Sequence, residues 1–316
     1  MKNFLNVRDV ENTEHLAQQA ISLKKDRFAF KSMGENKTMV LLFLNASLRT
    51  RISTQKAAQN LGMNTIVLNL GQDSWQMEYE DGAIMNGNTA EHIKEGAAVI
   101  SEYADIIGIR AFPTLTDRER DYSEFVLHKF LENVTVPVVN MESATVHPLQ
   151  SLTDLMTIRE HTKKDKPKVV LSWAPHIRSL PQCVSNSFAE WMNKSEVDFV
   201  ITHPEGYELN EQFSGKAKII CNQDEAFENA DFIYAKNWSS FHDYGKVLGT
   251  HSDWIINDKK MQLTNHAKFM HCLPTRRNVE VADDVLDSDY SIVINQAANR
   301  EFAAQAVLKN ILEGVG

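Results

Sequence analysis

The stretch that decides the fold is MVLLFLNASLRTR, Met39 to Arg51, in which an apolar run gives way to a hydroxylated, doubly basic turn. The run from Val40 to Leu44 is continuous and of strand length, which is typical of a parallel strand buried on both faces. Ser47 predicts a helix N-cap, and a helix is expected from Leu48 to Leu61. The stretch therefore predicts a strand, a turn and a helix of a parallel α/β fold.

The start of this helix is suited to binding an anion. A helix N-terminus leaves backbone N–H groups unpaired and carries a partial positive charge. Ser47 and Thr50 add hydroxyl donors, and the guanidinium groups of Arg49 and Arg51 fit phosphate or carboxylate. Taken alone, the pattern is equally consistent with a capped helix whose arginines face solvent, so other segments must decide.

Composition narrows the class of protein. The chain has 316 residues, enough for two domains, and its 43% hydrophobic and 24% charged residues are ordinary for a soluble globular protein. A net charge of -9 argues against a nucleic-acid partner, and no apolar stretch suggests a membrane span or signal peptide. Three scattered cysteines suggest neither disulfides nor a zinc site and indicate a cytoplasmic protein. Nucleotide-cradling glycine motifs are absent, so we expect a smaller anion.

Strands and helices alternate along the whole chain, which predicts two doubly wound parallel sheets. The expected strands span 40–44, 64–70, 105–112, 136–140, 168–174, 197–204, 217–221, 231–236, 268–273 and 291–296. Expected helices include 8–30, 122–131, one capped by Thr89 and one starting at Pro148. The predicted domains are 1–147 and 148–296, with a last helix at 297–316 returning to the first.

Polar motifs follow several of the predicted strands, at the edge where open parallel sheets bind their ligands. Arg49 and Arg110 fall there, as do two histidine motifs, His147-Pro148-Leu149-Gln150 and His271-Cys272-Leu273-Pro274. Each motif alone is weak, because a histidine before a proline or a cysteine at a strand end is more often structural. Their joint appearance in this order is a strong signal of one site.

Together these motifs resemble the aspartate/ornithine carbamoyltransferase family over essentially the whole chain. The resemblance implies a two-domain α/β enzyme that binds carbamoyl phosphate and uses no metal or cofactor. Its implied phosphate contacts are Ser47, Leu48, Arg49, Thr50, Arg110 and Arg300. Its implied carbamoyl contacts are His147, Gln150 and the backbone carbonyls of Cys272 and Leu273, so Cys272 is not required as a nucleophile. This set suits the reaction, since amine attack builds negative charge on the carbamoyl oxygen and the departing phosphate.

Three further segments resemble the branch of this family that acts on acylated ornithines: Asp73-Ser74-Trp75, Asn140-Met141-Glu142 and 273–278. The branch implies a homotrimer in which Trp75 reaches a neighbouring subunit's carbamoyl phosphate site. It also implies that Glu142 and Lys236 contact the amino-acid part of the acceptor, beside Cys272 and Leu273, although the first two could equally form a structural ion pair. A backbone knot is implied where 235–255 threads the loop 175–181.

The acceptor is expected to be N-succinylornithine, with N-acetylornithine as the alternative. The two differ by one carboxylate, for which His176, Arg178 and Arg276 offer cations, although a solvated basic loop is an equally simple interpretation. Acetyl-specific members of the branch tend to carry glutamate at the position of Ala90 and succinyl-specific members proline. Alanine matches neither, but it leaves space without negative charge. The expected products are N-succinylcitrulline and phosphate, in arginine biosynthesis; a non-catalytic carbamoyl phosphate-binding regulator is the alternative of another class.

Overall fold

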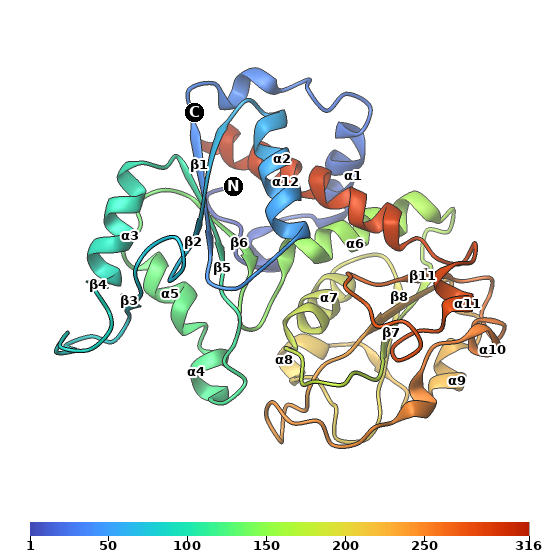
Figure 1. The fold of residues 1–316 in the computed structure, drawn as a ribbon. Coiled ribbons are helices and arrows are strands. Elements are labelled where there is room, and N and C mark those ends of the chain that lie inside the picture. The colour runs from blue at the N-terminus through green and yellow to red at the C-terminus, as the bar shows by residue number, and fades with distance from the viewer. Residues whose placement is uncertain (316) are drawn as a thin grey trace. The chain divides into compact units, whose positions relative to one another are not determined.

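The computed structural model describes residues 1–315, which form two compact α/β units (Figure 1). The first unit comprises 1–11, 19–149 and 300–315, and the second comprises 12–18 and 150–299. Three helices pass from one unit into the other: α1 (Thr13–Leu23), α6 (Pro148–His161) and α12 (Val293–Val315). Among residues 1–315, none of the helices combines the length and the apolar character that crossing a bilayer requires.

The first unit is built on a four-stranded parallel sheet in the order β2-β1-β5-β6. Its strands are β1 (Thr38–Phe43), β2 (Asn64–Asn69), β5 (Ile106–Arg110) and β6 (Val138–Glu142). The strand β5 is buried along its whole length, whereas β2 lies at the sheet edge with Ile66 exposed. Because β2 and β5 lie on opposite sides of β1, the topological switch point falls between β1 and β5.

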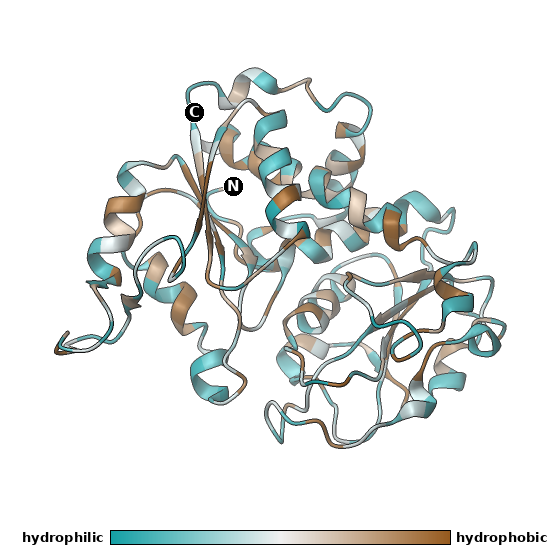
Figure 2. Ribbon diagram, in the orientation of Figure 1, coloured by the Kyte–Doolittle hydropathy of each residue, from teal (hydrophilic) through white to brown (hydrophobic). Residues whose placement is uncertain are grey.

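Helices cover both faces of this sheet (Figure 1). The helices α3 (Ile93–Glu102) and α5 (Phe125–Leu131) lie on one face, and α2 (Arg49–Asn60) and the last part of α12 lie on the other. The remaining elements are η1 (Val7–Asp9), η2 (Lys31–Gly34), α4 (Arg118–Tyr122) and a small ladder of β3 (Met77–Glu78) with β4 (Glu91–His92). Figure 2 shows hydrophobic residues along the strands. Val40 of β1 and Ile107 of β5 belong to one core cluster with Phe130 of α5.

The second unit carries a five-stranded parallel sheet in the order β11-β10-β7-β8-β9. Its strands are β7 (Lys168–Trp173), β8 (Asp198–Thr202), β9 (Lys218–Ile219), β10 (Phe232–Lys236) and β11 (Lys268–Met270). Its shorter elements are α7 (Cys183–Asn193), α8 (Glu211–Ser214), α9 (Gln223–Phe227), η3 (Ser252–Trp254), α10 (Asp258–Met261) and α11 (Asp283–Leu286). The switch point of this sheet lies between β7 and β10, and the prediction of two doubly wound parallel sheets is confirmed.

One predicted strand is wrong. Residues 291–296 were expected to form the last strand, but Ser291 makes a single parallel bridge to Phe269 and α12 begins at Val293. The short apolar run there has no strand-like alternation, so its pattern fits a helix start equally well. The closing helix is correspondingly longer than 297–316.

The predicted helix starts also need correction. Leu48, not Ser47, precedes α2, and no side chain caps that helix. Thr89 does not cap α3, because β4 intervenes and the ring of His92 accepts the hydrogen bond from the Lys94 N–H at 3.2 Å. The expected helix 122–131 is divided at Glu124, whose φ of 54° is incompatible with a continuous right-handed helix. The expected helix 8–30 is shortened to α1.

Candidate active site

The polar motifs of the first unit lie at the carboxyl ends of three adjacent strands. The turn 44–48 connects β1 to α2, Arg110 ends β5 and Glu142 ends β6. His147 follows five residues after Glu142, immediately before α6. Since parallel strands end at one edge, the sequence motifs are brought together at the switch point between β1 and β5.

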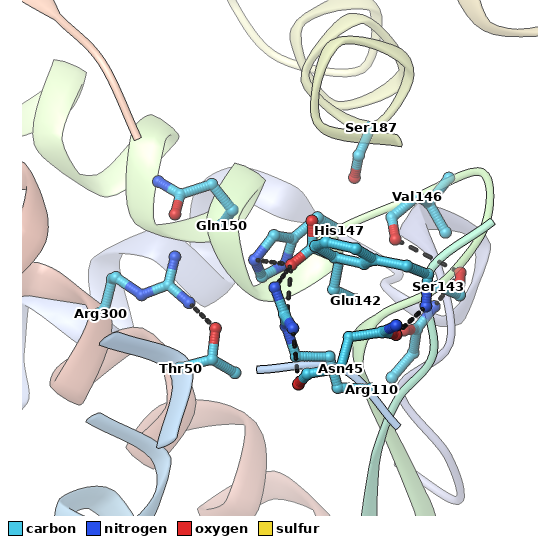
Figure 3. A network of polar contacts seen from close by, with 12 residues as sticks. Asn45, Thr50, Arg110, Glu142, Ser143, Val146, His147, Gln150, Ser187 and Arg300 are labelled. Carbon is cyan, nitrogen blue, oxygen red and sulfur yellow. Dashed lines mark hydrogen bonds and ion pairs between the residues drawn. The ribbon is translucent and has the colours of Figure 1, made fainter. Parts of the chain in front are cut away.

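Arg110 is the central side chain of this cluster (Figure 3). Its Nη1 donates to the carbonyl oxygens of Asn45 at 3.0 Å and Ala46 at 2.7 Å. Its Nε and Nη2 each lie 3.1 Å from Oε2 of Glu142. Both charged side chains are buried. Arg110 therefore fixes the backbone of the β1–α2 turn and forms an ion pair with the carboxylate at the end of β6. These contacts give Arg110 a structural role in positioning the two loops.

His147 is a neutral imidazole in this arrangement. Its Nε2 lies 3.5 Å from Oε2 of Glu142, a contact that would favour a charged ring. Burial and the nearby charges of Arg300 and Arg110 outweigh that contact and hold the pKa of His147 well below its ordinary value. A buried neutral imidazole can donate one hydrogen bond without carrying charge, so the structure favours a donating over a protonated His147.

Arg300 joins the cluster from α12. Its Nη2 donates to the hydroxyl of Thr50 at 2.7 Å, and both side chains are buried. Because the charges of Arg300 and Arg110 both act on the His147 ring, two cations and a neutral donor share one small region of the first unit (Figure 3). Such a set can hold an anion and polarise a carbonyl attached to it.

The two arginines of the S-L-R-T-R turn are directed differently. Arg49 is the first residue of α2 and is half-buried, at the place where a helix N-terminus favours an anion. Arg51 donates to the side chain of Asn69 and lies 4.7 Å from the ring centre of Phe43. The sequence placed both arginines with the anion, whereas the structure engages Arg51 with the end of β2.

Glu124 is a partly buried residue of this unit that sequence reasoning missed. It accepts hydrogen bonds from the Ser143 hydroxyl at 2.7 Å and from the backbone N–H groups of Ala144 at 3.1 Å and Thr145 at 2.8 Å. Burial raises its pKa in spite of these bonds. Glu124 thereby fixes the loop between Glu142 and His147. A single glutamate in a helical stretch gives no signal in the sequence for such a role.

In the second unit, the end of β11 forms a tight turn. The N–H of Leu273 donates to Nδ1 of His271 at 2.9 Å, and the N–H of His271 donates to Gln296 Oε1 at 2.9 Å. The side-chain amides of Gln296 and Gln150 each donate to Asp154 Oδ1 at 2.7 Å. Asp154 and Gln296 thus connect Gln150 to the H-C-L-P turn, and neither was predicted as a site residue.

The cations predicted for the acceptor gather in the same unit. The Nε of Arg276 donates to Nε2 of His176 at 3.1 Å, so this ring nitrogen is an acceptor and the positive charge lies on Arg276, while Nδ1 of His176 lies 3.0 Å from the backbone of Arg178. Lys236 ends β10 and is buried, with its Nζ donating to the Asn237 carbonyl at 2.9 Å. A cationic loop and a buried ammonium are therefore both present in this unit.

The predicted specificity position lies beside the predicted tryptophan in the first unit. The N–H of Ala90 donates to the Gln76 carbonyl at 3.1 Å, and Trp75 Nε1 donates to Glu91 Oε2 at 2.7 Å. Trp75 is 56% exposed, a large value for so apolar a side chain. The structure therefore brings Trp75 and Ala90 together at the surface of the first unit.

Two doubly wound units, one with two buried arginines and a neutral imidazole at its switch point, are typical of an α/β enzyme that handles a small anionic compound. Residues 2–160 match the carbamoyl-P binding domain of the aspartate/ornithine carbamoyltransferases, and residues 181–311 match the Asp/Orn binding domain. The chain belongs to the aspartate/ornithine carbamoyltransferase family and is a carbamoyltransferase.

Curated relatives cover the whole chain. An N-succinylornithine carbamoyltransferase of Bacteroides thetaiotaomicron is 52% identical over 100% of both chains. An N-acetylornithine carbamoyltransferase of Xanthomonas campestris is 34% identical over 98% of this chain and 97% of its own. A crystal structure of N-acetyl-L-ornithine transcarbamylase, a glutamate-to-alanine variant complexed with carbamyl phosphate and N-succinyl-L-norvaline, is 34% identical, with a TM-score of 0.91 over 98% of this chain and 100% of its own.

Proposed function

We propose that this chain transfers the carbamoyl group of carbamoyl phosphate to the δ-amine of N-succinylornithine, giving N-succinylcitrulline and phosphate, as a step of arginine biosynthesis. The observation that carries the proposal is the cluster of Arg110, Arg300 and neutral His147 at the switch point of the first sheet. The 52% identity to the Bacteroides enzyme supports the choice of acceptor. Formation of phosphate together with a carbamoylated acylornithine is the direct test.

The phosphate end of carbamoyl phosphate requires fixed positive charge. Such charge stabilises the transition state more than the bound substrate, because negative charge develops on the phosphate as it departs. We assign it to the backbone N–H groups of Ser47 and Leu48, to Arg49, and to the buried pair of Thr50 and Arg300. Arg110 fixes the turn that carries these groups and adds its own charge. The phosphate itself can accept the proton that the attacking amine loses.

The carbamoyl end requires a donor for its oxygen and acceptors for its amide hydrogens. Neutral His147 is the donor for the oxygen, where negative charge develops during attack. Gln150 and the backbone carbonyls of Cys272 and Leu273 hold the amide. In this scheme no covalent enzyme intermediate forms, because the amine attacks the carbamoyl carbon directly.

Replacing Cys272 with alanine is therefore expected to leave turnover within about threefold of the parent chain, since the claimed contact is a backbone carbonyl. Burial, with Asp154 and Cys272 nearby, raises the pKa of the Tyr234 hydroxyl, so the thiol lies in a buried polar environment and a small loss of stability is expected. Steady-state rates and thermal melts check both points. A folded but inactive Cys272→Ala variant would instead indicate a thiolate nucleophile.

The acceptor's two ends meet different groups in this proposal. Glu142 and Lys236 take the amino-acid portion of the acceptor, and His176, Arg178 and Arg276 take the distal carboxylate of the succinyl group. Ala90 presents no negative charge to that carboxylate. The glutamate-to-alanine variant of the related transcarbamylase, complexed with a succinyl compound, supports this interpretation.

Neutralising Arg178 and Arg276, which together make up the cationic loop, is expected to change the acceptor that the enzyme prefers. The double variant Arg178→Gln, Arg276→Gln should lose about 10–100-fold in kcat/KM for N-succinylornithine, the value of one or two charge-assisted hydrogen bonds. Its kcat/KM for N-acetylornithine should hardly change. Arg277→Gln is the matched control, because the Arg277 guanidinium pairs with Asp283 and Asp287. Equal losses of kcat/KM for both acceptors would show that Arg178 and Arg276 do not contact the succinyl carboxylate.

We place the chain in a homotrimer, with Trp75 contributed to a neighbouring subunit's site. Exposed apolar side chains support this assembly. Leu48 precedes α2, Ile52 lies on α2, Ile66 lies on the edge strand β2, and Trp75 lies in the loop that follows β2. Apolar groups gathered beside a functional turn are typical of an interface. A solution molar mass of three chains checks the assembly, and a monomeric active enzyme would contradict it.

We further propose that the second unit is knotted and that the enzyme works in the cytoplasm. Contacts between 235–255 and the loop 175–181 support the knot: the Ser239 N–H donates to the Leu180 carbonyl at 3.0 Å. The side chain of Asn237 donates to the Ala174 carbonyl at 2.7 Å. Within residues 1–315, Cys183, Cys221 and Cys272 form no disulfide, which is compatible with a reducing compartment.

A further inference from the structure

Glu280 is a buried carboxylate outside the motifs that define the site. Its side chain is 1% exposed, and it lies in the second unit between the H-C-L-P turn and α11. A glutamate is almost never fully buried unless it is paired and hydrogen-bonded. Its partners therefore indicate what it is for.

The carboxylate of Glu280 contacts residues at both ends of the segment 271–276. Its Oε2 accepts hydrogen bonds from the Arg276 N–H at 2.6 Å and the Thr275 hydroxyl at 3.3 Å. Its Oε1 lies 3.6 Å from Nε2 of His271. Burial raises the pKa of this carboxyl, but the contact with His271, the charge of Lys236 and the Arg276 amide outweigh burial and hold the pKa below its ordinary value. Glu280 is therefore ionised throughout the neutral range.

His271 transmits this contact to the turn. Its Nδ1 accepts a hydrogen bond from the Leu273 N–H at 2.9 Å, so Nδ1 carries no proton. The ring proton of the neutral imidazole must then sit on Nε2, which faces Glu280. A 3.6 Å contact between Glu280 and His271 and a hydrogen bond from the Leu273 N–H to His271 thus place the ring between a buried charge and the backbone of the turn.

The turn needs such support. Leu273 has a φ of 54°, in the left-handed region that side-chain-bearing residues rarely adopt. Residues with side chains keep this backbone conformation only when surrounding contacts stabilise it. His271 holds the Leu273 N–H and so orients the Cys272 carbonyl, which shares that peptide plane. Glu280 holds the Arg276 N–H at the far end of the turn and so limits the Leu273 carbonyl between the two fixed points.

We infer that Glu280 is a positioning residue for carbamoyl transfer, which acts through His271 and the Arg276 amide to aim the carbonyls of Cys272 and Leu273 at the carbamoyl amide. The inference rests on the proposed function for the role of those carbonyls. Glu280 does not touch a reacting atom. Its loss should misplace the carbamoyl group and lower kcat, while the phosphate contacts of the first unit remain intact.

The test is the kinetics of Glu280→Gln with N-succinylornithine, assayed well below its melting temperature. We expect kcat to fall about 10–100-fold, as a displacement near 1 Å of the bound group would produce, with KM for carbamoyl phosphate nearly unchanged. Asp283→Asn is the matched control, because this exposed carboxylate bonds Arg277 and Asn278 in the same loop. It should keep the parent kcat. A kcat for Glu280→Gln within about twofold of the parent would overturn the inference.

Two further measurements separate the possible failures. If Glu280→Gln does not fold, the shorter carboxylate of Glu280→Asp takes its place, with loss of kcat supporting the inference and an unchanged kcat overturning it. Nitrogen-15 shifts of the His271 ring in the parent protein test the connection without any assay of activity: an Nε2–H tautomer is expected, and an Nδ1–H tautomer would refute it. Absence of product from the parent enzyme would instead refute the proposed function.

Discussion

Replacing Arg110 with methionine is expected to abolish measurable carbamoyl transfer and to destabilise the first unit by about 3–5 kcal/mol. The guanidinium holds the carbonyls of Asn45 and Ala46 and pairs with Glu142, and both members of the pair are buried. Its removal releases the turn and leaves the Glu142 carboxylate without its cation. Urea unfolding and initial rates measure the two effects separately.

A second substitution separates stability from function at this position. The double variant Arg110→Met, Glu142→Met removes the stranded carboxylate, so it should recover most of the lost stability, because replacing a buried ion pair by apolar groups is often neutral. Its activity should stay lost, since both the charge that aids the phosphate and the Glu142 contact proposed for the acceptor are missing. Recovery of activity together with stability would show that Arg110 has only a structural role.

Replacing Arg49 with alanine is expected to lower kcat/KM by about two to three orders of magnitude, the usual cost of one preorganised donor to developing charge. Arg49 begins α2, where the helix N-terminus and its side chain act on the same anion. The protein should stay folded, because the side chain is half-buried at the surface end of the helix.

Arg51 supplies the matched control for Arg49. It has the same charge two residues further along α2 but binds Asn69 and packs on Phe43. Arg51→Ala should therefore reduce activity far less than Arg49→Ala. Equal losses would mean that the phosphate site is assigned to the wrong side of the turn.

The strands that carry the site could be predicted because their sequences are continuous apolar runs followed by polar turns. The runs at Val40–Leu44 and 231–236 leave little choice but buried parallel strands, and their ends give the position of the site. The run 291–296 was misassigned because six residues are too few to distinguish a strand from the start of a buried helix. Local patterns therefore located the site but not every element around it.

The residues that hold the site in shape could not be predicted. Glu124, Asp154 and Glu280 act through contacts with loops distant in sequence, and no spacing in the chain marks them. Arg51 shows the converse, since its position in the motif suggested an anion contact that the structure directs to Asn69. Motifs indicate which groups meet the substrate, whereas packing decides which groups support them.

The most direct measurement compares ornithine, N-acetylornithine and N-succinylornithine as acceptors, with carbamoyl phosphate held constant and both phosphate and the carbamoylated product quantified. The proposal predicts the highest kcat/KM for N-succinylornithine, a lower value for the acetyl compound and negligible turnover of ornithine. Preference for N-acetylornithine would contradict the assignment of the cationic loop while leaving the carbamoyl phosphate site intact. Binding of carbamoyl phosphate without turnover of any acceptor would contradict the account and favour a regulatory protein.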